Sequence, residues 1–137
     1  RSLAPQLGTS TTTWTNLLAG VYHCPSDKRV SKLSYGMNVY FELGPDDDYA
    51  GKPTTWRRST SVRQPSVTIL IAETASAADH IMPNYWVTTT DASDVDARRH
   101  KGRANYIFAD GHCEARKFET TYQPAKLLDL WNPGCAQ

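Results

Sequence analysis

The sequence predicts an α+β domain in which an antiparallel sheet of four or more strands is accompanied by short helices. Val67–Glu73 is a nearly continuous apolar run and suits a buried, central strand. Asn105–Phe118 is typical of a β-hairpin, because strand-forming residues flank Asp110-Gly111, a favoured pair for a tight turn. Trp14–Tyr22 places apolar residues at helical spacing. These patterns permit the α+β class without fixing its topology.

The other elements follow from local signals in chain order. Residues 1–13 are polar and form a lead-in, and Cys24–Asp27 is a turn because proline fixes φ there. Gly36 falls inside a predicted strand and indicates a bulge or a close backbone approach. The remaining predicted elements are strands at Ser34–Phe41 and Tyr85–Thr89, an extended segment at Thr55–Val62, and a short helix at Thr120–Leu130 with Pro124 near its first turn.

The hairpin is expected to close through a two-residue type I′ loop, since both positions of such a turn need positive φ. That loop would consist of Asp110 and Gly111. It would place Phe108 opposite Cys113 and Ile107 opposite Glu114.

Composition bounds the possibilities. A chain of 137 residues with 39% hydrophobic residues suits a single domain, residues 1–137, with one modest core. A net charge of +1 gives no global attraction to nucleic acid or to an anionic membrane. No G-x-S-x-G elbow or comparable constellation is present in the sequence, so we expect no enzyme and name no catalytic residue.

Four segments in order carry a family resemblance. They are Tyr22–Asp27 (YHCPSD), Ser34–Asn38 (SYGMN), Pro65–Thr74 (PSVTILIAET), and His100 with nine residues between it and Asp110-Gly111. Together they resemble the bacterial prepilin-like proteins of the H-x9-D-G type, relatives of type II secretion pseudopilins and type IV pilins. The resemblance implies a pilin-like globular head with His100, Asp110 and Gly111 as a structural motif.

The resemblance also implies a function. Such proteins begin with a long apolar helix behind a processing site, whereas this chain begins with polar residues at Arg1. We therefore expect the soluble head of a longer precursor, without its N-terminal anchor helix. The head would be a structural subunit of a surface or periplasmic filament and would pack against other pilin-like subunits. It would be exported, and would meet the inner membrane before assembly only through the upstream helix.

A binding function is the alternative to a structural one. The basic run Arg98, Arg99, Lys101 and Arg103 would suit DNA or an anionic polysaccharide on a filament tip. It would equally suit a solvated loop that pairs with nearby aspartates. The four tryptophans offer faces for sugar rings, although in a small chain they also serve as core or subunit contacts; they are Trp14, Trp56, Trp86 and Trp131.

Two groups of residues invite a metal. Asp91, Asp94 and Asp96 follow a D-x2-D-x-D spacing that would suit calcium, and the resemblance adds weight because major pseudopilins carry calcium in a head loop. Neither this loop nor the one at Asp46–Asp48 matches the EF-hand pattern, so solvated loops without any cofactor remain the alternative. His100, Asp110 and His112 would suit zinc or would simply fix the hairpin.

The cysteines are odd in number: Cys24, Cys113 and Cys135. Without a Cys-x-x-Cys pair, the sequence does not predict a structural zinc site. In the resembled family the cysteine of the CPSD segment can face a cysteine on the upstream helix. The resemblance therefore implies that Cys24 is unpaired here and that Cys113 and Cys135 form a disulfide. Three reduced, buried thiols are the alternative.

Overall fold

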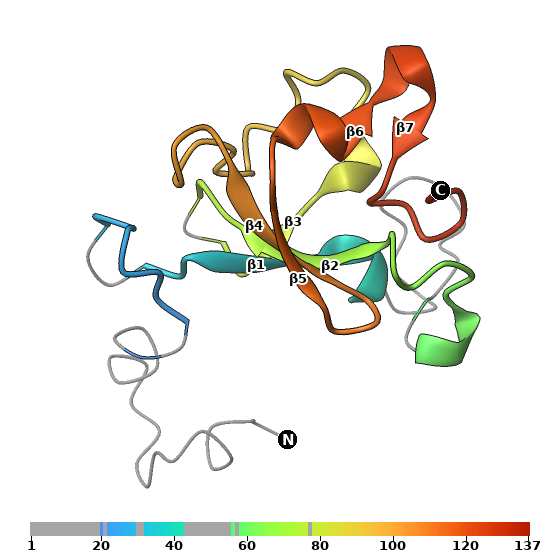
Figure 1. Ribbon diagram of the computed structural model, residues 1–137, viewed down its shortest axis with the longest axis horizontal. Coiled ribbons are helices and arrows are strands. Elements are labelled where there is room, and N and C mark those ends of the chain that lie inside the picture. Colours follow the sequence, from blue (N-terminus) through green and yellow to red (C-terminus); the bar gives the residue numbers. More distant parts are fainter. Residues whose placement is uncertain (1–19, 21, 30–31, 43–55, 57, 77) are drawn as a thin grey trace, which may run out of the picture.

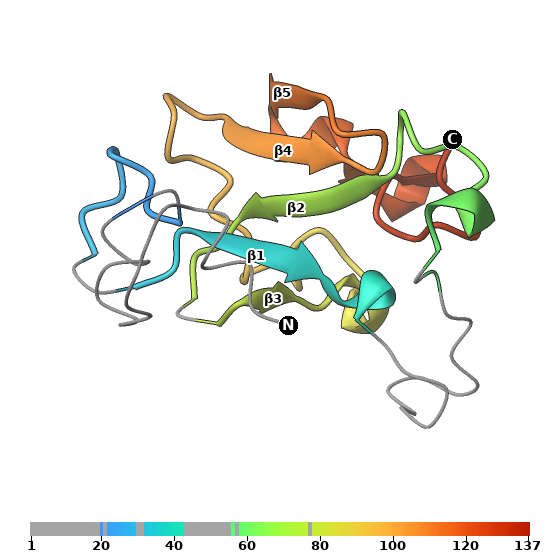
Figure 2. The same cartoon turned by 90° about the horizontal axis from the view of Figure 1, so that it is seen from below.

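The computed structural model describes residues 20, 22–29, 32–42, 56, 58–76 and 78–137. Its main feature is a five-stranded sheet with the strand order β3-β1-β2-β4-β5. Figure 2 shows the strands in this order from one edge of the sheet to the other. The strands are β1 (Tyr35–Asn38), β2 (Ile69–Glu73), β3 (His80–Ile81), β4 (Ala104–Phe108) and β5 (Cys113–Arg116). A second, two-stranded sheet joins β6 (Tyr122–Gln123) to β7 (Leu128–Asp129).

The predicted central strand is confirmed. β2 lies in the middle of the sheet and pairs antiparallel with both β1 and β4. Ile69 and Ala72 are buried, as an apolar run with strands on both sides requires.

The predicted fold class is wrong. The sheet is mixed rather than antiparallel, because β3 pairs parallel with β1. The described residues contain no α-helix, only three-residue 3-10 turns; these are η2 (Val39–Phe41), η3 (Ser59–Ser61), η4 (Pro83–Tyr85), η5 (Phe118–Thr120) and η6 (Pro124–Lys126). The domain is therefore mostly sheet and not an α+β pilin head with short helices (Figure 1).

The helix expected at Thr120–Leu130 is replaced by β6, η6 and β7. Leu127 has a φ of 57°, so the chain reverses there and β7 returns along β6. Tyr122, before this reversal, and Leu130, after it, are both buried. The helix expected at Trp14–Tyr22 falls almost wholly outside the described residues.

The strand expected at Ser34–Phe41 is shorter than predicted. It stops at Asn38, whose side chain accepts a hydrogen bond from the Tyr40 N–H and starts η2. Gly36 is a place of close approach, since a Cβ atom there would lie 3.1 Å from Ile81 Cγ1. The strand expected at Tyr85–Thr89 does not form, because η4 and the turns after it occupy that stretch. Of Thr55–Val62, the described part contains only η3.

The hairpin forms, but in another register. Ile107 pairs with Cys113, and Phe108 bonds through its N–H to the His112 carbonyl at 2.9 Å. The loop therefore has three residues, and Gly111 alone takes a positive φ, of 94°, while Asp110 does not. This is a type I turn closed by a left-handed glycine, not the expected type I′ turn.

Replacing Gly111 with valine should destabilise the domain by about 1–3 kcal/mol, because a β-branched residue is strained at positive φ. Urea unfolding followed by circular dichroism measures the loss. Asp110→Gly separates the two turn types: it should be mildly destabilising here, whereas a type I′ turn would favour glycine at that position. A stabilising Asp110→Gly would contradict the three-residue loop.

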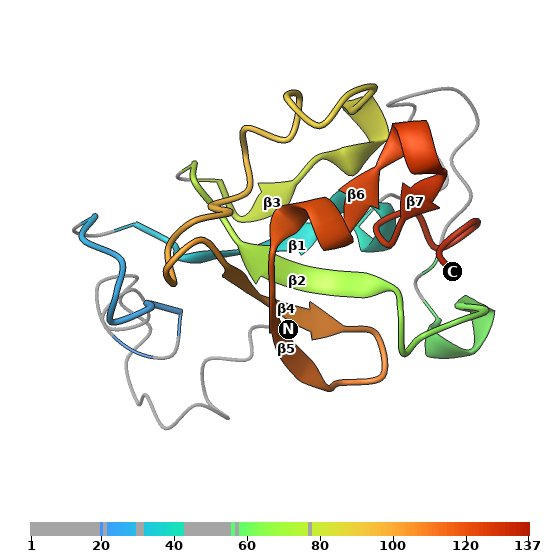
Figure 3. The same cartoon turned by 45° about the horizontal axis from the view of Figure 1, so that its top comes forward.

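The core lies between one face of the main sheet and the C-terminal segment. η5, β6, η6 and β7 run across that face, as Figure 3 shows. Tyr106, Phe108 and Trp131 are fully buried there, and Trp86 packs edge-on against Trp131 at 5.0 Å between ring centroids. Trp86 and Trp131 are therefore core residues, and the open sugar-binding surface envisaged for the tryptophans is not formed by them.

Candidate functional site: a buried ionic cluster

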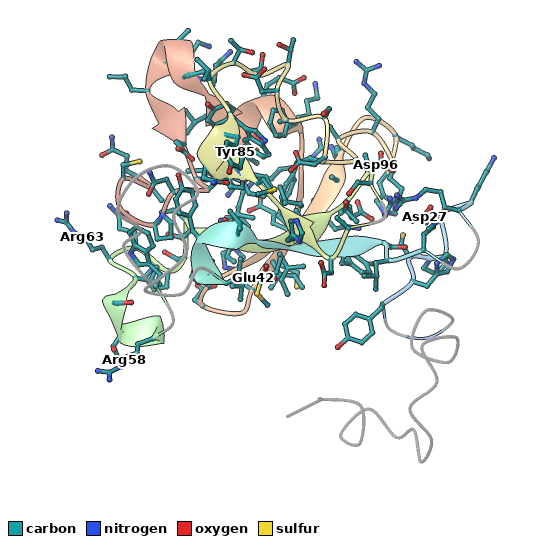
Figure 4. All side chains as sticks on the ribbon, turned by 180° about the vertical axis from the view of Figure 1, so that it is seen from behind. Asp27, Glu42, Arg58, Arg63, Tyr85 and Asp96 are labelled. Atoms are coloured by element: carbon teal, nitrogen blue, oxygen red, sulfur yellow. The ribbon has the colours of Figure 1, made fainter. Side chains whose placement is uncertain are left out.

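Residues from three of the segments that carry the family resemblance, together with His100 from the fourth, meet at one end of the sheet. We call their meeting point the motif cluster; its members are Cys24, Asp27, Arg29, Ser34, Glu73, Asp96, Arg99 and His100. Figure 4 shows Asp27 and Asp96 together at this end, far from Arg58 and Arg63 at the other. The cluster is built from a turn, the residue before β1, the end of β2, and the loop that leads into β4.

The first half of the cluster fastens the turn at Asp27 to the sheet. Asp27 accepts hydrogen bonds from the Arg29 side chain, at 2.6 Å to one carboxylate oxygen, and from the Ser34 hydroxyl at 2.8 Å. The same guanidinium donates to the carbonyls of Thr74 and Ala75, each at 2.7 Å. One arginine thus joins the turn to the residues that follow β2.

Arg99 is the centre of the cluster and is only 3% exposed. It donates to the carbonyls of Ser34, at 3.0 Å, and Thr74, at 2.8 Å. It also pairs with three carboxylates, at distances of 2.9 Å for Asp96, 3.2 Å for Asp27 and 3.6 Å for Glu73. A planar guanidinium with five donors suits such a junction better than a lysine would.

Glu73 and His100 form the second half. Glu73 is fully buried at the end of an apolar strand, and its Oε1 lies 2.8 Å from His100 Nε2. Its other oxygen accepts the Asn105 N–H at 2.9 Å. The Cys24 thiol lies 3.5 Å from the same His100 Nε2. A signal for this half was present in the sequence, because a carboxylate that ends a buried strand needs a partner.

The surroundings of Asp27 depress its pKa. The hydrogen bond from the Arg29 side chain is the largest cause, and the Arg29 N–H, the Ser34 hydroxyl and the charge of Arg99 add to it against the opposing effect of burial. The pKa of the Asp27 carboxyl is therefore far below its ordinary value of 3.8.

Stability should consequently fall in acid. A carboxyl with a lower pKa in the folded state contributes stability above its unfolded pKa, and that contribution is lost as the pH falls through the folded value. The free energy of unfolding should decrease from about pH 5 towards about pH 2. Asp27→Asn should be less stable at neutral pH but lose less on acidification, as urea unfolding at several pH values would show. Glu119→Gln, at an exposed position, is the matched control.

The predicted calcium ligands are not brought together. Asp91 accepts the N–H groups of Val87 and Thr88 and closes a turn. Asp94 accepts the Met82 N–H, and Asp96 pairs with Arg99. Each carboxylate therefore has a separate structural task. The residues Asp46–Asp48 lie outside the described part of the chain.

His100 and Asp110 lie at opposite ends of β4, so the H-x9-D-G spacing spans this strand and its two flanking loops. Five residues of strand separate the two ends by about 14 Å. His112 instead contacts Asp110, at 2.6 Å, and stacks on Phe108. The predicted group of His100, Asp110 and His112 is therefore not a common site.

The predicted bridge between Cys113 and Cys135 is not formed, and all three thiols are free. The register of the hairpin explains this. Cys113 pairs with Ile107, and therefore points away from the face that holds Tyr106 and the C-terminal segment. Cys24 is buried, whereas Cys113 and Cys135 are exposed, so the alternative of three buried thiols also fails.

The basic run divides in the same way. Arg99 is buried in the cluster, while Arg98, Lys101 and Arg103 are exposed. A patch for nucleic acid would therefore have one cation fewer than the sequence suggests.

The cluster resembles a nucleophilic triad only in its residue types. In a triad the histidine uses one ring nitrogen for the nucleophile and the other for the carboxylate. Here Cys24 and Glu73 both approach Nε2 of His100, and Cys24 is only 2% exposed. The arrangement suits holding a positive charge between three ligands rather than attacking a substrate.

No protein-family model matches the chain, and no similar curated protein or solved structure is found. None of the helices in the described residues is long and apolar enough to cross a membrane. The resemblance to the H-x9-D-G proteins therefore rests on the four sequence segments named above.

Proposed function

We propose that the protein is the head of a structural subunit in a pilin-like or pseudopilin-like filament, exported and assembled with other such subunits. The basis of this proposal is the resemblance of the four sequence segments to the H-x9-D-G proteins. The observation that supports it is that residues from three of these segments, together with the His100 end of the fourth, meet in the motif cluster. The proposal concerns assembly and does not require the helical architecture of known pilin heads.

The cluster ties the chain leading into the sheet to the sheet itself. Arg29 and Arg99 both donate to the Thr74 carbonyl just after β2, which lies 45 residues after the first and 25 residues before the second. In a filament whose core is made by upstream helices, tension on a head enters through its N-terminal side. A buried ionic junction at that point resists such tension, which favours a load-bearing role over a catalytic one.

The full reading frame tests the proposal. We expect an apolar helix upstream, with a glutamate near its start, and an antiserum to the head should label sheared surface filaments or a periplasmic assembly. Arg98→Ala in the full-length protein should assemble as the wild type does and serves as the control. A reading frame without such a helix, or a head found only in the cytosol, would contradict the proposal.

Capture of a ligand is a second candidate, favoured by a hollow of about 570 Å³ beside η4. Its lining includes Tyr85, Trp86, Thr90 and Asp94. Asp94 Oδ1 is buried there without a hydrogen-bond partner among the residues that the structure describes, and the exposed Tyr85 ring on the same lining suits a sugar ring beside that acceptor. Glycan arrays and DNA-binding assays at low salt separate the candidates, because silence in both leaves the structural role alone.

A further inference from the structure

Three metal-ligating side chains converge within the motif cluster. The Cys24 Sγ, a Glu73 carboxylate oxygen and His100 Nε2 all lie within 4.8 Å of one another, and they form the only such group of three in the described residues. They come from three separate segments. The three residues are far apart in the sequence, so no spacing motif such as Cys-x-x-Cys predicts this group.

We propose that Cys24, Glu73 and His100 bind one zinc ion, with a fourth position open to water. A thiolate, an imidazole and a carboxylate are the three ligand types that zinc prefers, and calcium or magnesium would reject the sulfur. Cys24 and Glu73 are buried, while the His100 side chain is 30% exposed. The solvent-facing imidazole therefore marks the side from which an ion enters and on which water completes the shell.

The distance between Cys24 Sγ and His100 Nε2 already suits zinc. Zinc bonds of about 2.3 Å to sulfur and about 2.05 Å to nitrogen, at a tetrahedral angle, separate those two atoms by about 3.6 Å. Cys24 Sγ and His100 Nε2 are 3.5 Å apart. The 2.8 Å contact of Glu73 with Nε2 is a hydrogen-bond distance, so the carboxylate must withdraw by about 0.5 Å when zinc replaces the proton.

Shared use of one nitrogen supports the same assignment. Both Cys24 and Glu73 approach Nε2, and one N–H bond points in only one direction. A cation between the three atoms satisfies both contacts at once.

The charges of the cluster also favour a cation. Arg29 and Arg99 face the three carboxylates of Asp27, Asp96 and Glu73, which leaves one negative charge in a largely buried place. A zinc ion bound with the Cys24 thiolate brings the total to zero.

The ligands are already held in position. Glu73 is fixed by the Asn105 N–H and by Arg99, and the Cys24 N–H donates to the Ser34 hydroxyl at 2.9 Å. His100 sits in a loop closed by two backbone hydrogen bonds with Arg103. Support of this kind orients ligands and strengthens metal binding.

Metal analysis of the folded 137-residue chain, after dialysis against zinc and then against buffer, tests the proposal. We expect one zinc ion per chain. With Co²⁺ in place of zinc, a thiolate-to-metal charge-transfer band should appear in the near ultraviolet. Cys24→Ala and His100→Ala should lose the ion and the band, whereas Cys113→Ala and His112→Ala, which alter an exposed cysteine and histidine, should keep both.

A second measurement avoids variants at the site, because loss of a buried cluster residue can unfold the domain. In a Cys113→Ser/Cys135→Ser protein, zinc should slow alkylation of the remaining Cys24 thiol at least tenfold, and a chelator should restore the rate. A folded wild-type chain that retains no zinc and gives no Co²⁺ band would overturn the proposal. So would a Cys24→Ala protein that binds both metals as the wild type does, or alkylation that zinc leaves unchanged.

Discussion

Arg99→Met is expected to lower the free energy of unfolding by about 3–5 kcal/mol and the melting temperature by about 10–20 °C. The side chain is 3% exposed and pairs with Asp27, Glu73 and Asp96. Methionine fills much of the same volume, so the loss comes from leaving buried carboxylates without their partner. Thermal and urea unfolding followed by circular dichroism measure both quantities.

The neighbouring Arg98 supplies the matched control, since its side chain is exposed. Arg98→Met should change stability by less than about 0.5 kcal/mol. Combining Arg99→Met with Asp27→Asn should cost less than the sum of the two single changes, because the second change removes a charge that the first left unpaired. A loss below about 1 kcal/mol for Arg99→Met would contradict the central role given to this arginine.

Trp131→Ala is expected to lower the free energy of unfolding by about 3–5 kcal/mol, because it leaves a cavity in the core. Trp131 is fully buried, packs edge-on against Trp86 and Tyr106, and donates through Nε1 to the Thr121 hydroxyl at 3.3 Å. Circular dichroism is the suitable probe of unfolding, because the change removes a fluorophore.

Val87→Ala is the control for Trp131→Ala, since Val87 is 76% exposed and its truncation should be nearly neutral. Trp131→Phe should fall between the two, because it keeps an aromatic ring but loses the hydrogen bond. Equal stability of Trp131→Ala and the wild type would mean that the C-terminal segment does not seal the core.

The sequence was sufficient for those parts of the fold that depend on local chemistry. An apolar run predicted β2, and an Asp-Gly pair between strand-forming residues predicted the hairpin. The register was missed because Asp-Gly suits both a two-residue loop and a three-residue loop that ends in glycine. The choice is made by distant groups, since the N–H groups of Ala109 and Asp110 donate to the carbonyls of Thr68 and Pro65.

The parallel pairing of β3 was also beyond local signals. This strand has only two residues, and a pattern that short carries no periodicity. At the position of closest contact, Gly36 lets the backbone of His80 approach β1. The sequence indicated a bulge or a close backbone approach at this glycine, but it did not indicate which segment approaches.

The site was predictable as a set of segments and not as a set of contacts. The motifs contained Cys24, Asp27, Glu73 and His100. The run of basic residues contained Arg99, but its pattern did not distinguish this buried arginine from the exposed cations around it. Lys101 and Gly102 both have positive φ, and the turn they make ends the loop in which Arg98 is exposed and the Arg99 side chain is buried. Which cation is buried thus depends on a loop conformation that composition does not reveal.

The motif cluster also sets an order of events during synthesis. Cys24 meets His100 across 76 residues of chain, and Arg29 meets the Thr74 carbonyl across 45. At a translation rate of about 5–20 residues per second, the thiol is made about 4–15 s before its imidazole partner. Throughout that interval the Cys24 thiol lacks its imidazole partner. This cysteine therefore remains accessible to oxidants and chaperones until the loop before β4 has emerged and the junction can close.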